Sequence, residues 1–174
     1  MPSGKLDLLH ISKTFDVDGR KITALEDVTL SVAQGEFVTL VGASGCGKST
    51  LLRIVAGLEL ADRGTALHDG AGISGPSLDR GIVFQEPRLF PWLTVAQNIA
   101  LGLENARLTS AEKRDFIARH IDLVGLEGFE NAFPRQLSGG MAQRAALARS
   151  LVNRPGELLH DEPIGALAAL TRAR

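Results

Sequence analysis

The sequence predicts an α/β fold, and three features of the chain indicate it. Apolar and polar residues alternate over residues 28–32, which is typical of a half-buried strand. An apolar run at 37–41 leads into a glycine-rich turn and then into a helix with apolar residues at helical spacing. Residues 94–124 and 137–151 show helical periodicity. With 174 residues, 44% of them hydrophobic and 22% charged, the chain can bury the core of a globular domain.

The glycine-rich turn has the spacing of a phosphate-binding loop, G-x-x-x-x-G-K-[ST]. Its glycines let successive N–H groups point at an anion, and the following helix adds the positive end of its dipole. Lys48 would reach the β- and γ-phosphates of a nucleotide, and the Ser49 hydroxyl would bind Mg²⁺. This spacing arises by chance in about one chain in a hundred of this length, so a plain glycine turn is the weaker interpretation. The predicted ligand-binding residues of the loop are Gly42, Ser44, Gly45, Cys46, Gly47, Lys48, Ser49 and Thr50.

Charge and composition exclude several classes of protein. The formal net charge is -1 with scattered Lys and Arg, so we expect no nucleic-acid partner. The single cysteine, Cys46, excludes an internal disulfide and suits a reducing cytosol. We find no secretory signal and no apolar run long enough to span a bilayer. Any role at a membrane is therefore expected to come through a partner.

Short strands and capped helices are predicted for the rest of the chain. Strands are expected at 6–11, 64–68, 81–84 and 157–160, and a last helix at 167–172. Thr94 is expected to cap one helix, and Thr109 with Glu112 forms a capping box before another.

An aromatic residue, Phe15, lies in the polar region at 13–20, which we expect to be a turn. Its ring either packs against the protein or stacks on a purine base.

Four motifs in a fixed order resemble those of the ATP-binding-cassette (ABC) ATPases. They are the phosphate loop, Gln85 after a strand, Ser-Gly-Gly at 138–140 opening a helix, and Asp161-Glu162 after an apolar strand. The run Leu-Ser-Gly-Gly-x-x-Gln-Arg before Asp-Glu-Pro is highly specific. The resemblance, which runs from about Leu6 to the last residue, implies a P-loop NTPase core with an N-terminal antiparallel β subdomain. It further implies an inserted helical subdomain at about 90–150, within a single nucleotide-binding domain over 1–174 that is incomplete at its C-terminus.

The resemblance assigns roles in binding and hydrolysing Mg-ATP. Phe15 looks like the adenine-stacking aromatic, and Lys48, Ser49 and Thr50 look like ligands of phosphate and Mg²⁺. Gln85 resembles the glutamine that touches Mg²⁺ and the attacking water, and Asp161 resembles the acid that holds Mg²⁺ through water. Glu162 would be the general base.

The signature residues Ser138, Gly139 and Gly140 look like those that face the ATP held by an opposing subunit. This implies a homodimer in which two chains, placed head to tail, enclose two ATP molecules.

The stretch from Gln85 to Val95 most resembles importer ATPases for nitrate, sulfonate, taurine or related anions. This implies ATP hydrolysis coupled to transport through a membrane permease, at the cytoplasmic face of the plasma membrane. We expect Leu89, Phe90, Trp92 and Val95 to be exposed and to contact the permease. For Phe90 and Trp92, packing within the helical lobe is an equal alternative.

Three departures from the family put hydrolysis in doubt. No histidine follows Glu162, although the family has a further strand ending in a histidine that contacts the γ-phosphate. Glu157 and His160 interrupt a strand that is usually apolar, and we expect His160 to be neutral there. Ala168 replaces an aspartate that crosses to the other subunit. We therefore expect the chain to bind ATP or ADP more readily than it turns ATP over.

The rival hypothesis is a truncated or degenerate nucleotide-binding module that binds ATP and permease without productive hydrolysis. A DNA-associated cassette ATPase shares the signature. In that class a long coiled-coil insertion would separate the positions of Gln85 and Ser138. The spacing between these residues is too short here for such an insertion.

Overall fold

The computed structural model describes residues 5–161. These residues fall into two compact units, the first ending at Arg80 and the second beginning at Gly81. Within the described range, none of the helices combines the length and the apolar character needed to cross a membrane.

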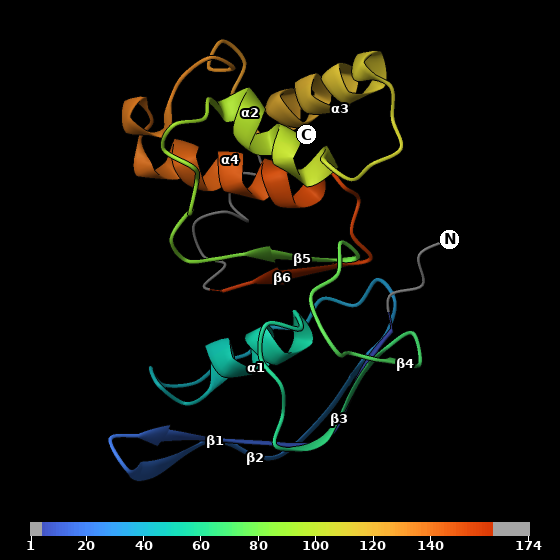
Figure 1. Ribbon diagram of the computed structural model, residues 1–174, viewed down its shortest axis with the longest axis vertical. Coiled ribbons are helices and arrows are strands. Elements are labelled where there is room, and N and C mark those ends of the chain that lie inside the picture. The colour runs from blue at the N-terminus through green and yellow to red at the C-terminus, as the bar shows by residue number, and fades with distance from the viewer. Residues whose placement is uncertain (1–4, 162–174) are drawn as a thin grey trace. The chain divides into compact units, whose positions relative to one another are not determined.

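A four-stranded sheet and one helix form the first unit (Figure 1). The spatial order of the strands is β2-β1-β3-β4, and every neighbouring pair is antiparallel. Antiparallel pairing allows tight hairpins, whereas parallel strands need long crossover connections. The predicted antiparallel β region is therefore present. The bounds are β1 Leu6–Val17, β2 Arg20–Val32, α1 Lys48–Val55, β3 Arg63–His68 and β4 Ala71–Gly72.

The hairpin between β1 and β2 is longer than the sequence predicted. Strand β1 continues to Val17, and Phe15 lies within it, paired with Ile22 of β2. The prediction that Phe15 lies in a turn was wrong, because only Asp18 and Gly19 connect the strands. Their φ values of 53° and 77° are those of a type I′ turn, for which Asp-Gly is a preferred pair.

The segment at 37–41, which was predicted to be a strand, has no regular secondary structure. Phe37 and Val41 are 69% and 91% exposed. A strand is stable only where a neighbour satisfies its backbone N–H and C=O groups. In the part of the chain that the structure describes, no strand pairs with this segment. The predicted strand was wrong because its apolar composition does not supply a pairing partner.

The second unit combines a two-stranded sheet with a helical lobe. Strands β5 and β6 pair with each other, and their arrows point the same way in Figure 1. The predicted strands at 81–84 and 157–160 are confirmed to within one residue. The bounds are β5 Arg80–Val83, α2 Val95–Ala100, η1 Leu101–Leu103, α3 Ser110–Leu123, η2 Pro134–Gln136, α4 Gly139–Leu151 and β6 Glu157–His160.

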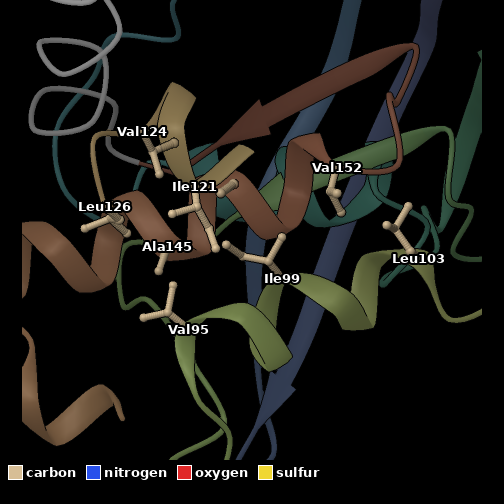
Figure 2. Packing of buried hydrophobic residues seen from close by; sticks show 9 residues of the cluster. Val95, Ile99, Leu103, Ile121, Val124, Leu126, Ala145 and Val152 are labelled. Carbon is tan, nitrogen blue, oxygen red and sulfur yellow. The ribbon is translucent and has the colours of Figure 1, made fainter. Parts of the chain in front are cut away.

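The core of the helical lobe lies where α2, α3 and α4 pack together (Figure 2). Both predicted helix caps are confirmed, because Thr94 and Thr109 each accept a hydrogen bond from the backbone three residues on. Val95 is completely buried, so the expectation that it is exposed was wrong. The helix that Thr94 caps turns Val95 inward with the other core residues, which are Ile99, Leu103, Ile121, Val124, Leu126, Ala145, Ala148 and Val152.

A buried asparagine fixes the proline-broken segment that precedes α2. Asn98 is 0% exposed, and its Oδ1 accepts a hydrogen bond from the N–H of Phe90 at 2.8 Å. Its Nδ2 donates to the carbonyls of Phe90, Leu93 and Thr94 at 3.2, 3.0 and 3.0 Å. Buried backbone groups must be paired, and Asn98 supplies the partners in a segment without regular structure.

Replacing Asn98 by Leu is expected to lower the free energy of unfolding of the lobe by about 2–4 kcal/mol, because the N–H of Phe90 and the carbonyl of Leu93 lose the partner that Asn98 supplies. The measurement is urea unfolding followed by fluorescence of Trp92, the only tryptophan of the chain. Asn105→Leu, at an exposed position, is the matched control. Equal midpoints for the two variants would show that Asn98 does not hold the segment.

Candidate functional site

The predicted phosphate loop is an exposed turn that leads directly into α1. Gly45 and Gly47 have φ values of 80° and 96°, a region that favours glycine, and Gly47 is the residue that precedes the first helical residue. Lys48 opens the helix, and its Nζ donates to the carbonyl oxygens of Gly42 and Ala43 at 2.8 Å each. The ammonium group is thus held among the backbone groups of the loop, where a bound phosphate would meet it.

A close backbone approach fixes the end of the loop against strand β2. A Cβ atom placed on Gly47 would lie 2.3 Å from the carbonyl oxygen of Ala24 and 2.9 Å from Cδ2 of Leu25. No side chain fits at these distances, and Gly47 is buried. The loop is therefore seated on the same hairpin that carries Phe15, although how Phe15 meets a ligand stays a prediction.

Gln85 and Asp161 follow neighbouring strands of the second unit. Gln85 comes after β5 and Asp161 comes after β6, and the N–H of Asp161 donates to the carbonyl of Val83 at 3.0 Å. The carboxyl ends of parallel strands lie at one edge of a sheet, which is where ligands bind in open α/β sheets. Burial lowers the pKa of the neighbouring His160, in agreement with the expected neutral ring. Glu162 lies outside the described residues.

Helix α4 begins at the signature residues. Ser138 is its N-cap and accepts a hydrogen bond from the N–H of Met141 at 3.3 Å. Gly139 and Gly140 are exposed, and a Cβ on either would meet nothing within 4 Å. The first turn of the helix therefore presents backbone N–H groups to solvent, as the predicted contact with a phosphate requires.

Three side chains of α4 hold the segment that carries Gln85, and the sequence reasoning had not found them. Gln143 Nε2 donates to the carbonyl oxygen of Gln85. Arg149 donates to the carbonyls of Arg88 and Pro87 at 2.9 and 3.1 Å, and the Ser150 hydroxyl donates to the carbonyl of Ile82 at 2.9 Å. Burial lowers the pKa of Arg149. No local signal marks these residues, because each acts on a segment about 60 positions away.

The oxygen atoms at the predicted metal positions suit Mg²⁺. Between residues 5 and 161, no three His, Cys, Asp or Glu side chains are grouped as a metal site would require. Mg²⁺ in nucleotide sites needs only one or two protein ligands, because water and substrate phosphates complete its octahedron. The hydroxyl of Ser49, the amide of Gln85 and the carboxylate of Asp161 are hard oxygen donors of this kind.

The chain belongs to the ABC transporter family, whose family model matches residues 25–165. The aliphatic sulfonates import ATP-binding protein of Bacillus subtilis is 51% identical over 160 residues, which are 92% of this chain and 62% of that protein. The nitrate import ATP-binding protein of Synechocystis sp. is 46% identical over 169 residues, 97% of this chain and 64% of that protein. This chain thus spans just under two thirds of the length of these curated relatives.

Solved structures of ABC cassettes have the same fold. A dimeric cassette of a bacterial ABC transporter is matched with a TM-score of 0.88 at 33% identity, over 97% of this chain and 80% of that chain. A dimeric cassette in a post-hydrolysis state, bound to ADP and phosphate, is matched with a TM-score of 0.86 at 33% identity over the same shares. The predicted P-loop NTPase fold is confirmed.

Replacing Gly47 by Ala is expected to weaken binding of Mg-ATP, the predicted ligand, by about tenfold or more, because the new methyl group forces the loop away from Ala24. Titration calorimetry measures the affinity. Gly72→Ala is the matched control, since a Cβ there meets nothing within 4 Å. An unchanged affinity in the Gly47 variant would mean that the loop does not need this close approach.

Proposed function

We propose that this chain is the ATP-binding and ATP-hydrolysing subunit of an ABC importer for a nitrate-, sulfonate- or taurine-like anion. The observation that carries the proposal is the phosphate loop. Gly45 and Gly47 adopt positive φ values in its turn, and Lys48, at the start of the helix, donates from Nζ to the carbonyl oxygens of Gly42 and Ala43. Relatives named for sulfonate and nitrate import support the class of solute.

In this proposal the loop binds the phosphates of ATP and the carboxyl edge of β5 and β6 supplies the hydrolytic groups. Lys48 would contact the β- and γ-phosphates, and Ser49, Gln85 and Asp161 would hold Mg²⁺, which would neutralise charge on the transferred phosphoryl group. Glu162 acts as general base on the attacking water, and Phe15 stacks on the adenine. The loop contributes through Gly42, Ser44, Gly45, Cys46, Gly47 and Thr50 in addition.

The proposed assembly is a homodimer bound to a membrane permease. The exposed N-terminus of α4, with Ser138, Gly139 and Gly140, would meet the ATP of the opposing subunit. The dimeric structures of two similar cassettes support this arrangement. The subunit would then work at the cytoplasmic face of the plasma membrane.

The proposed permease contact is the pair of aromatic side chains before α2. Phe90 and Trp92 are 42% and 68% exposed, and their ring centroids lie 5.5 Å apart. Leu89 is half-buried and packs against the core of the lobe. Hydrogen bonds to Asn98 hold this segment in place, so an exposed aromatic pair is presented on a rigid support.

One observation favours the rival function, a nucleotide-binding module without productive hydrolysis. Among the residues that the structure describes, no strand pairs with the exposed segment at 37–41, which directly precedes the phosphate loop. A loop without a rigid strand before it is positioned less accurately, and hydrolysis is more sensitive to geometry than binding is.

Replacing Lys48 by Ala is expected to weaken binding of Mg-ATP by about 10- to 100-fold, because a charge-assisted hydrogen bond to phosphate is lost. Titration calorimetry gives the affinity. Lys113→Ala on α3, with the same change of charge, should bind like the parent. The proposed function fails if both variants bind like the parent.

Replacing Glu162 by Gln separates the two functions. If Glu162 is the general base, steady-state release of phosphate falls by about 100-fold or more while Mg-ATP still binds. A module that does not hydrolyse ATP shows only background phosphate release in the parent and the variant alike, which would contradict the enzyme and support the rival.

A further inference from the structure

We propose that Lys13 is a positioning residue for Phe15 and that it ties the base-binding strand to the helix of the phosphate loop. This inference rests on the proposed function, in which Phe15 stacks on the adenine. The inference gives a role to the ion cluster of Lys13, Glu59 and Asp62, none of which is a proposed phosphate ligand.

The ammonium group of Lys13 is held by three oxygen atoms from one short segment. Its Nζ lies 2.7 Å from Oε1 of Glu59 and 3.3 Å from Oδ1 of Asp62, and it donates to the carbonyl of Leu60 at 2.9 Å. The side chain of Lys13 is only 12% exposed. The hydrogen bond from Lys13 lowers the pKa of Glu59, so the cluster stays charged at neutral pH. The cation is therefore fixed in one position.

The same ammonium group lies beside the aromatic ring. Nζ of Lys13 is 5.3 Å from the centroid of the Phe15 ring, within the range of a cation–π contact. Lys13 and Phe15 lie two positions apart in β1. Fixing the cation therefore restricts where the ring lies.

Backbone hydrogen bonds clamp the residues around Lys13 to the same segment. Oδ2 of Asp62 accepts from the N–H of Thr14 at 2.7 Å, and this bond is the main cause of the lowered pKa of Asp62. The N–H of Asp62 donates to the carbonyl of Ser12 at 2.9 Å. The stretch at 12–15 is thus bound to residues 59–62 from its side chains and from its backbone.

The anchoring segment continues directly from the helix of the phosphate loop. The N–H groups of Leu58 and Glu59 both donate to the carbonyl of Arg53, at 2.8 and 3.3 Å, near the end of α1. Helix α1 begins at Lys48, so its first residue is the proposed phosphate ligand. One rigid helix, about 12 Å long, therefore lies between the groups that would bind the phosphates and those that position the ring.

The test compares two ligands, Mg-ATP and Mg-tripolyphosphate, which share the phosphates and differ in the base. Lys13→Met is expected to weaken ATP binding about 3- to 10-fold, because the ring is no longer held, and to change tripolyphosphate binding by less than about twofold. Lys13→Arg, which keeps the charge, should restore most of the ATP affinity. Lys21→Met, at an exposed position of the same hairpin, is the control and should bind both ligands like the parent.

Two further variants separate failure of this inference from failure of the proposed function. Phe15→Ala should weaken ATP binding and spare tripolyphosphate. If it changes neither, the stacking role of Phe15 is wrong, and the positioning role with it. If Phe15→Ala instead weakens only ATP binding while Lys13→Met leaves it unchanged, Lys13 is not a positioning residue. The same conclusion follows if Lys13→Met weakens the binding of both ligands equally. If the Lys13→Met variant does not fold, Glu59→Gln, a milder change in the same cluster, replaces it. Glu59→Gln should also weaken ATP binding. Unchanged ATP binding in this variant would overturn the inference.

Discussion

The contact between Gly47 and the carbonyl of Ala24 is the constraint on which the proposed nucleotide site depends. It brings the backbone of the phosphate loop against strand β2 at a distance that only glycine permits. Because β2 is the partner of β1, this one contact seats the loop on the hairpin that carries Phe15. The helix that follows then begins at Lys48, with its backbone N–H groups facing the loop. The residues proposed to bind the phosphates and the base are thus supported by one sheet.

The second unit positions its candidate groups by a different device. Strands β5 and β6 bring Gln85 and Asp161 to one edge, and side chains of α4 donate to backbone carbonyls around Gln85. Ser138 is the N-cap of the same helix, so the signature residues and the segment of Gln85 share one rigid support. A displacement of α4 would therefore move both together, which would couple the two groups of candidate residues.

Features encoded over a few residues could be predicted from the sequence, and features that need a distant partner could not. Glycine spacing indicated the phosphate loop, and the Thr109 and Glu112 pair indicated the start of α3, because each depends on local chemistry.

The prediction of a strand at 37–41 was wrong, since strands need neighbours that composition does not reveal. Val95 was placed on the surface together with the aromatic residues before it, although the predicted helix after Thr94 turns it inward. The extent of β1 was underestimated, although the Asp18-Gly19 turn was a usable signal. The roles of all the predicted site residues stay predictions.

The central claim is that the backbone N–H groups at 42–49 bind the terminal phosphates of a nucleotide. The most direct measurement is a set of amide nitrogen and proton NMR spectra recorded with Mg-ATP, Mg-ADP and AMP. We predict that the largest shifts occur at 42–49 with ATP and ADP and that they are absent with AMP, which lacks the terminal phosphates. Shifts of equal size with AMP, or shifts that leave 42–49 unchanged while other amides respond to ATP, would contradict it.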